Sequence, residues 1–293
     1  TEIYTLSLHD ALPIFRKESL EIALYMSDRG CDLWMGPMVI GGATGPMTIA
    51  GNVSLQNAEM LGSMFIAAAI SKTKSLGYGY GSGNHTMDMR TMLCSFGSPN
   101  QALLGVAVGQ LGRYYGLWCI SNNGLSDSFF RDFQYGTEKA LSAVFSMLAG
   151  CSGMGCQGIV GADQGVSLEQ IVLDDEFIGY YNFIAENLND LKTDANELAF
   201  DVIRQVGTGG SFIAEEHTVD NLASNYFGSD IFTRMPYDSW TASGRRSALE
   251  NAHERVLTLT EGYKTMQPVL LPSQFEELTR IRDEARLAMR EVG

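Results

Sequence analysis

The sequence predicts an α/β fold in which a parallel sheet is built from repeated strand–helix units. Short apolar runs flanked by glycine predict strands at 33–40, 75–80, 117–121, 155–160 and 211–214. Apolar residues at three-to-four spacing predict helices between and after them, at 55–71, 100–115, 131–149, 168–191 and 194–206. The unit recurs at roughly forty residues, a pattern shared by doubly wound sheets and (β/α)₈ barrels.

Capping residues indicate where these helices begin. The expected N-caps are Asn52 or Ser54, Ser98, Ser126 or Ser128, Ser167, and Thr193. The tail beyond Arg245 predicts two amphipathic helices separated by Pro268 and Pro272.

Composition limits the kind of protein. The chain has 293 residues, 45% apolar and 18% charged, which is typical of a folded globular protein. A net charge of −14 argues against nucleic acid or an anionic membrane as partner, because both would repel most of the surface. The cysteine count of 5 is odd and favours reduced thiols. With no run of 18 apolar residues and no signal peptide in the sequence, we expect a cytoplasmic location.

The first residues need separate treatment. Residues 5–14, TLSLHDALPI, match the translation of a common sequencing-library adapter residue for residue. We interpret residues 1–15 as an artefact, so that His9 and Asp10 carry no functional weight, and residues 16–293 as one domain with C-terminal helices. We expect the protein itself to continue upstream of Phe15.

The glycine-rich stretch from Ile40 to Met60 resembles a phosphate-binding loop at first sight. Dinucleotide and Walker loops require glycines at fixed offsets, and the Walker loop also requires a lysine at the helix start. Gly41, Gly42 and Gly45 match neither spacing, and no lysine follows until Lys72. The loop therefore predicts another kind of ligand.

Polar residues follow each predicted strand, at 41–48, 81–91, 122–128, 161–170 and 215–221. In parallel α/β folds these loops gather at the carboxyl ends of the strands, where active sites are built. The ionisable residues there are Asp88, Arg90, Asp127, Asp163, Glu169 and His217. Each also has a structural interpretation: Asp127 and Asp163 as helix caps, Arg90 as an ion-pair partner, and Glu169 as a capping-box residue.

Several motifs resemble, in the same order, those of the trimethylamine methyltransferase family. They read GGATGPMTIAGNVSLQNAEML, DMRT, GSPNQALL, GRYYGLWC, NNGLSDS, SLEQIVLDDE and EHTVDN. The resemblance implies the C-terminal portion of a TIM (β/α)₈ barrel, truncated at its N-terminus. It also implies transfer of a methyl group from an amine to the cobalt(I) of a separate corrinoid protein.

The resemblance implies partners and a substrate class. The corrinoid (cobalamin) would be carried by the cognate corrinoid protein, with no metal held by this chain and with Gly42, Thr44, Gly45 and Asp88 facing the corrinoid. The loops after the predicted strands contain only standard amino acids. This favours a family member that lacks pyrrolysine and uses a quaternary amine such as glycine betaine as its substrate. Association of several copies of this chain into a homo-oligomer is compatible with binding of the corrinoid protein and the amine.

A quaternary ammonium needs aromatic faces, and its carboxylate needs donors. Tyr78, Tyr80, Trp118 and Phe212 are candidate aromatics, although strand aromatics also pack cores. We expect Tyr80 and Phe212 to bind substrate because they are nearest the loops, with Arg90 and Asn123 as further binding residues. His217, unless it is a satisfied helix-cap histidine, and Asp127 are the expected catalytic residues.

Other reaction classes lack their motifs. The chain has no G-x-S-x-G, no H-E-x-x-H, and no zinc spacing around Cys151 and Cys156, which we expect to be buried small residues. The strand ends lack a lysine for Schiff-base chemistry. Two alternatives stay open: a TIM-barrel lyase with Asp88 or Asp127 as its base, and a non-catalytic ligand-binding fragment.

Overall fold

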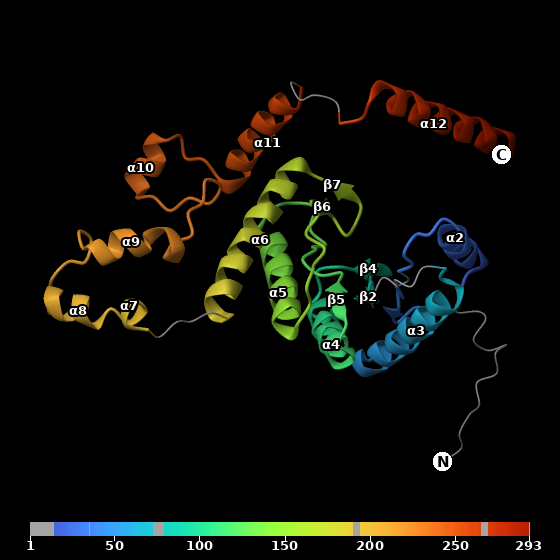
Figure 1. The fold of residues 1–293 in the computed structure, drawn as a ribbon, viewed down its shortest axis with the longest axis horizontal. Coiled ribbons are helices and arrows are strands. Elements are labelled where there is room, and N and C mark those ends of the chain that lie inside the picture. Colours follow the sequence, from blue (N-terminus) through green and yellow to red (C-terminus); the bar gives the residue numbers. More distant parts are fainter. Residues whose placement is uncertain (1–14, 35, 73–78, 190–193, 265–268, 293) are drawn as a thin grey trace, which may run out of the picture. The chain divides into compact units, whose positions relative to one another are not determined.

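The computed structural model describes residues 15–34, 36–72, 79–189, 194–264 and 269–292 (Figure 1). The chain divides into two units, Thr1–Ala252 and His253–Gly293. Within the described residues, all the strands belong to the first unit, as does the pocket against β2 and β5.

Parallel strand pairs form the centre of the first unit. β1 (Ile40–Gly41) pairs with β3 (His85–Asp88), and β2 (Gly79–Ser82) pairs with β5 (Trp118–Ser121). A further parallel bridge joins Ile120 to Gly153. These pairs confirm the predicted parallel strand–helix units. Only Gly83 and Asn84 separate β2 from β3, so the stretch 79–88 pairs in parallel with β1 before it and with β5 after it, whereas the strand order of a doubly wound sheet reverses.

Two hairpins depart from the sequence prediction. β3 turns back into β4 (Leu93–Ser95), so the prediction of a loop over 81–91 was wrong. In the predicted strand 155–160, only β6 (Ile159–Val160) is in a strand, and it pairs antiparallel with β7 (Gly165–Val166). Gly158 and Gly161 have φ of 74° and 62°, a left-handed conformation that bends the chain on both sides of β6.

Two other predicted strands are mostly absent from the described residues. In the run 33–40 only Ile40 is in a strand, and in the run 211–214 no residue is in a strand and Ile213 and Ala214 lie in a turn. The start of the run 75–80 lies outside the described residues.

The main helices confirm the sequence prediction. They are α3 (Ile49–Ile70), α4 (Pro99–Tyr115), α5 (Phe133–Ala149) and α6 (Leu168–Asn189). Figure 1 shows α4 and α5 packed together beside β5. Gly116 and Gly150 end α4 and α5 with φ of 66° and 112°, which a residue with a Cβ would adopt only with strain. The sequence prediction missed α2 (Lys17–Asp28).

The helix starts were predicted less well. Thr48 caps α3 by accepting from Gly51 N at 3.3 Å, and Asp132 caps α5 by accepting from Tyr135 N at 3.0 Å. The predictions of Asn52 or Ser54, and of Ser126 or Ser128, were therefore wrong. Ser98 precedes α4 as predicted, and Ser167 accepts from Gln170 N at 3.3 Å at the start of α6. Thr193 lies outside the described residues.

Shorter helices follow α6. The predicted helix 194–206 is divided into α7 (Ala195–Leu198) and α8 (Phe200–Val206) by Ala199, whose φ is 49°. Then come α9 (Glu216–Asn225) and α10 (Tyr237–Ala242). The two tail helices are present as predicted, as α11 (Ala248–Lys264) and α12 (Pro272–Val292).

The core lies between the parallel strands and helices α3 and α4. Met60, Tyr80, Val108, Cys119 and Cys151 form one buried cluster. All the cysteines are free thiols; Cys151 is a small buried residue as expected, whereas Cys156 is only partly buried. Burial against this apolar cluster supplies the main stabilising contribution at the strand–helix interface.

Helix α3 also bears on localisation. By length and composition alone it could cross a membrane, although it contains no unbroken run of 18 apolar residues. A single helix of this kind is weak evidence, because core helices of soluble proteins pass the same test. Its buried positions include Asn52, Gln56 and Ser63, whose side chains face the protein interior.

Candidate functional site

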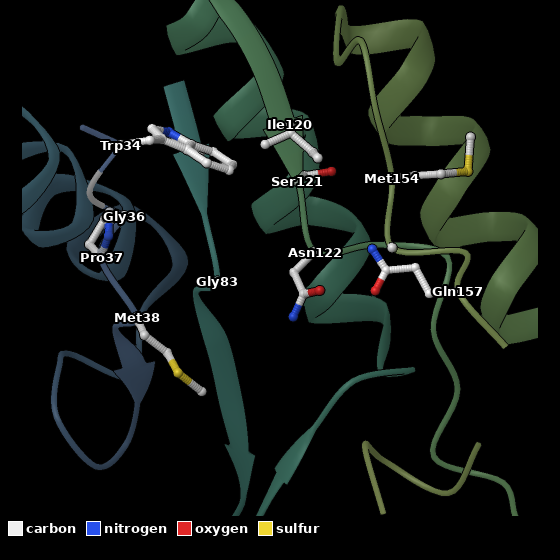
Figure 2. A pocket seen from close by; sticks show the side chains of 12 residues that line it. Trp34, Gly36, Pro37, Met38, Gly83, Ile120, Ser121, Asn122, Met154 and Gln157 are labelled. Atoms are coloured by element: carbon white, nitrogen blue, oxygen red, sulfur yellow. The ribbon is translucent and has the colours of Figure 1, made fainter. Parts of the chain in front are cut away.

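A pocket lies against the face of β2 and β5 that points away from helices α3 and α4 (Figure 2). Its volume is about 360 Å³, enough for a small organic ligand. The lining residues come from the segment before β1, from the ends of β2 and β5, and from the turn after Gly153. They are Trp34, Gly36, Pro37, Met38, Gly81, Gly83, Ile120, Ser121, Asn122, Met154, Gly155 and Gln157.

Strand alternation decides which residues reach the pocket. Tyr80 and Cys119 point into the core cluster, so their neighbours Gly81 and Ile120 point to the opposite face. Gly81 is opposite Ile120 in the strand register, and a Cβ on Gly81 would collide with the Trp34 ring. Glycine at this strand position therefore makes room for the indole.

Two tryptophans form the aromatic part of this face. The rings of Trp34 and Trp118 meet edge to face, with centroids 6.2 Å apart and planes at 62°. Their residues remain 52% and 50% exposed. Large aromatic faces left open at a strand face are suited to binding a cation.

The polar part of the pocket begins at Asn122. Its Nδ2 lies 3.1 Å from Nε2 of His85, and Nδ1 of His85 lies 3.0 Å from Oε1 of Gln101. His85 and Gln101 are buried, with exposures of 0% and 1%. The pocket-facing amide is thus connected to an interior hydrogen-bond network.

The network continues behind the strands. Gln101 Nε2 donates to the carbonyls of Asn84 and Asn122 and to Oδ1 of Asn123, at 3.2, 3.1 and 3.2 Å. On the other side, Asn52 Nδ2 donates to the His85 carbonyl at 3.1 Å and Asn84 Nδ2 to Oδ1 of Asn52 at 3.2 Å. Buried polar groups that are paired in this way fix the positions of the loops that carry them.

Burial lowers the pKa of His85. Desolvation has the largest effect, because it penalises the imidazolium form. Hydrogen bonds to Gln101 and to the Ser95 backbone, and the charges of Asp127 and Asp163, oppose this lowering. His85 is therefore neutral at pH 7.

Two predicted substrate-binding residues lie inside the protein. Tyr80 is 0% exposed, stacks on Tyr115, and donates from its hydroxyl to Oδ1 of Asn57 at 2.8 Å. Asn123 is also 0% exposed, and its Nδ2 donates to the Ser142 carbonyl at 3.1 Å and to Ser146 Oγ. Both side chains support the helix layer.

The predicted acidic residues hold turns. Oδ1 of Asp127 accepts from Phe96 N at 2.7 Å, and its Oδ2 accepts from Ser95 Oγ at 2.7 Å and Gly97 N at 3.2 Å, which fixes the segment between β4 and α4. Asp127 thus does not cap a helix, and Asp163 lies at φ 71° in the β6–β7 turn.

Asp88 and Arg90 belong to the β3–β4 turn. Asp88 accepts from the backbone N–H of Arg90 and Thr91 at 2.8 and 3.1 Å, and these bonds lower the pKa of its carboxyl. A guanidinium nitrogen of Arg90 lies 3.5 Å from Oδ2 of Asp88, so Arg90 forms the ion pair that its structural interpretation predicts. Glu169 accepts from Ser167 Oγ at 2.7 Å at the start of α6, close to the capping role expected for it.

The predicted corrinoid-facing glycines form a tight turn after β1. Gly42 N donates to the Gly45 carbonyl at 3.0 Å, and Thr44 Oγ1 accepts from Ile40 N at 2.9 Å. Gly42 has φ 88°, and a Cβ there would lie 3.0 and 3.1 Å from the sulfurs of Met89 and Met47. These exposed methionines give the turn an apolar, adaptable rim.

The remaining predicted residues, Phe212 and His217, lie around α9. Phe212 is 41% exposed before the helix, and its carbonyl accepts from Thr218 Oγ1 at 2.6 Å. His217 lies in the first turn of α9, and its Nε2 is 2.9 Å from the Asn196 carbonyl. The motif 215–221 was expected to be a loop, and it is helical from Glu216.

Sequence reasoning missed Trp34 and Asn122 as pocket residues, and His85 and Gln101 as the hydrogen-bonded residues behind Asn122. Trp34 falls in a run interpreted as a strand, and His85 in a stretch interpreted as a loop. A usable signal was the glycine alternation of G-Y-G-S-G at 79–83, which leaves one strand face open for an aromatic residue. Among the described residues, no group of His, Cys, Asp and Glu side chains could hold a metal ion.

Fold and site together define an α/β protein with an aromatic and amide-lined pocket on parallel strands. A family model described as trimethylamine methyltransferase (MTTB) matches residues 13–285. The chain belongs to this family.

Individual relatives agree with this assignment. A glycine betaine methyltransferase from Desulfitobacterium hafniense (strain Y51) is 32% identical over 84% of this chain and 50% of the relative. A trimethylamine methyltransferase (MttB) from Desulfitobacterium hafniense (strain DSM 10664 / DCB-2) is 28% identical over 85% of this chain and 49% of its own. One from Methanosarcina thermophila is 27% identical over 78% and 46%. The chain spans about half the length of the curated relatives it matches.

Proposed function

We propose that this chain carries the substrate pocket of a methyltransferase that moves a methyl group from a quaternary amine of the glycine betaine type to the cobalt(I) of a cognate corrinoid protein. Family membership supports the reaction class. The observation that carries the substrate class is the half-exposed pair of Trp34 and Trp118 beside the pocket. Aromatic faces are the usual means of binding a quaternary ammonium.

The chemistry explains what the pocket must do. In the transfer, the carbon–nitrogen bond breaks with its electron pair remaining on nitrogen, and cobalt(I) supplies the pair for the new bond to the methyl carbon. A quaternary nitrogen leaves as a neutral tertiary amine and requires no protonation. The residues of this chain therefore have to bind the cation and orient one methyl group. Holding that methyl group close to the cobalt and in line with it promotes the transfer.

We assign the substrate wall to Trp34 and Asn122, which line the pocket, and to Trp118, whose ring contacts Trp34 beside it. Tyr80 and Asn123 are not part of this wall, because their side chains are enclosed in the helix layer. A role in substrate binding for Arg90 and Phe212, and in catalysis for His217 and Asp127, remains a prediction.

The turn after β1 is proposed to face the corrinoid. Gly42, Thr44 and Gly45 follow the carboxyl end of β1, and Asp88 ends the neighbouring β3. The exposed Met47 and Met89 beside Gly42 fit a flat, largely apolar macrocycle. When bound there by its own protein, the corrinoid would supply the nucleophilic metal, and the chain would supply a close-fitting backbone and soft side chains.

The parallel pairing of the stretch 79–88 with β1 before it and β5 after it supports a (β/α)₈ barrel for the whole protein, with the pocket on its inner face. Cytoplasmic location and homo-oligomerisation stay predictions of the sequence.

The lyase alternative has no observation in its favour. The carboxylate oxygens of Asp127 and Asp88, its proposed bases, accept hydrogen bonds from backbone N–H groups of the turns that they hold.

The test mixes the complete gene product that contains this sequence with a reduced cognate corrinoid protein and a methylated amine. With glycine betaine we expect the cobalt(I) spectrum to be replaced by that of the methylated corrinoid, with one dimethylglycine formed per methyl group transferred. The absence of any spectral change with glycine betaine, other betaines and trimethylamine would refute methyl transfer. Binding of glycine betaine without transfer would instead support the non-catalytic alternative.

A further inference from the structure

We propose that His85 is a positioning residue that fixes the amide of Asn122 so that its carbonyl oxygen, and not its NH₂ group, is presented to the pocket. The pocket wall then carries a hydrogen-bond acceptor, which favours a methylated cation at Asn122 and disfavours a carboxylate there. The choice of ligand rests on the proposed function, whereas the direction of the amide follows from the hydrogen-bond network alone.

The direction of the network is set first at Asn123. Its Nδ2 lies 3.1 Å from the backbone carbonyl of Ser142, and a carbonyl can only accept. The amide nitrogen of Asn123 must therefore face Ser142. Its Oδ1 faces the other way, toward Gln101, as an acceptor.

Gln101 passes this direction on. Its Nε2 lies near three acceptors, namely Oδ1 of Asn123 and the backbone carbonyls of Asn84 and Asn122. If the Gln101 amide were flipped, its oxygen would face these three oxygens with no donor between them, at high cost in a buried site. Oε1 of Gln101 consequently faces His85, 3.0 Å from Nδ1.

The acceptor Oε1 of Gln101 fixes the tautomer of His85. Oε1 of Gln101 can only accept, so Nδ1 of His85 carries the proton. A neutral imidazole with its proton on Nδ1 has an acceptor at Nε2, and the Nδ2 of Asn122 lies 3.1 Å from that atom. Complete burial of the ring keeps it neutral.

The last link is Asn122 itself. Because its NH₂ group donates to His85, its Oδ1 is the amide atom left for the pocket. Figure 2 shows this oxygen turned toward the side from which Gln157 enters the pocket. An oxygen at this wall can accept weak C–H···O contacts from N-methyl groups, whose hydrogens are polarised by the ammonium charge.

The opposite tautomer of His85 would turn the pocket wall at Asn122 from a hydrogen-bond acceptor into a donor. With the proton on Nε2, His85 would donate, Asn122 would turn its oxygen to the ring, and its NH₂ group would face the pocket and favour an anion. The Ser95 backbone, which also hydrogen-bonds to the ring, is a competing acceptor for such a proton. The tautomer of His85 is therefore the quantity to measure.

The first experiment is ¹⁵N NMR of the complete gene product labelled at histidine, with the His85 signals identified by their loss in the His85→Gln variant. We expect a protonated Nδ1 and an unprotonated, hydrogen-bond-accepting Nε2 at pH 7. A protonated Nε2 would overturn the proposal. This result does not depend on methyl transfer, so it separates failure of the amide direction from failure of the proposed function.

The second experiment measures what the wall prefers. Glycine betaine and 3,3-dimethylbutyrate share shape and carboxylate and differ by the positive nitrogen, so the ratio of their dissociation constants isolates the cation. Asn122→Leu should lower this preference for the cation by about 2- to 5-fold. An unchanged or increased preference in a variant that melts like the original protein would refute an acceptor at this wall.

Discussion

The aromatic pair gives a prediction whose size can be worked out from the structure. Replacing Trp34 by leucine removes one face that can meet a quaternary ammonium and keeps an apolar side chain in its place. Trp34 is 52% exposed, so its cation–π contribution belongs to the solvated end of the range, about 0.5–1 kcal/mol. Since about 1.4 kcal/mol corresponds to tenfold, the dissociation constant for glycine betaine should rise about 2- to 5-fold.

Isothermal titration of the complete gene product measures this change. The carbon isostere 3,3-dimethylbutyrate, which lacks the positive nitrogen, is titrated in parallel, and its weaker binding should change much less because it has no cation to meet the ring. The matched control is Trp240→Leu. Trp240 lies in α10, where its indole donates to the Arg246 carbonyl at 2.9 Å, and it does not line the pocket.

The partner ring adds a second check. The rings of Trp34 and Trp118 meet edge to face with centroids 6.2 Å apart. The effect of replacing both tryptophans by leucine on the dissociation constant should therefore differ from the sum of the two single effects. If Trp34→Leu weakened both ligands equally, the ring would act by shape alone. If neither ligand were affected, the tryptophan face would not be the binding wall, and the reasoning would be wrong.

Three further predictions concern stability and packing. Lys139 and Asp174 form a buried pair at 3.0 Å, so Asp174→Ala should lower the free energy of unfolding in urea by about 3–5 kcal/mol because it leaves the lysine charge unpaired; a loss below about 1 kcal/mol would contradict this. Gly81→Ala should cost about 1–3 kcal/mol in the same assay because its Cβ meets the Trp34 ring, and Trp34→Leu should restore part of the loss. His85 has a lowered pKa in the folded chain, so unfolding should become easier as pH falls below its ordinary value of 6.5, where the unfolded state binds the proton first. Urea midpoints across this range should fall less steeply in His85→Gln, and parallel slopes would count against the assignment.

The sequence predicted the helices well and the strands poorly, for a physical reason. Helices α3 to α6 each carry many turns of apolar periodicity, which survives local exceptions. The strands are only two to four residues long, too short for a period of two to be distinguished from a loop. Their positions depend on pairing between segments far apart in the chain.

Capping shows the same limit at the scale of one residue. Thr48, Asn52 and Ser54 all lie at the start of α3, and each has a side chain able to cap a helix. Asn52 instead turns inward and donates to the His85 carbonyl, 33 residues further along. Only this long-range bond distinguishes it from a cap, so local sequence favours the wrong residue.

The pocket was missed by a single position, which shows how the strand geometry selects function. Asn122 and Asn123 are adjacent and chemically identical, and they follow β5 on opposite faces. One faces the pocket, while the other is enclosed by Ser142 and Gln101. Because the side chains of successive residues in an extended chain point in opposite directions, moving one residue along the chain replaces the pocket-facing amide of Asn122 by the structural amide of Asn123. The buried amide nevertheless acts on the exposed one through Gln101 and His85. Substituting Asn123 should therefore disturb both stability and the pocket, and only the His85 tautomer can tell the two effects apart.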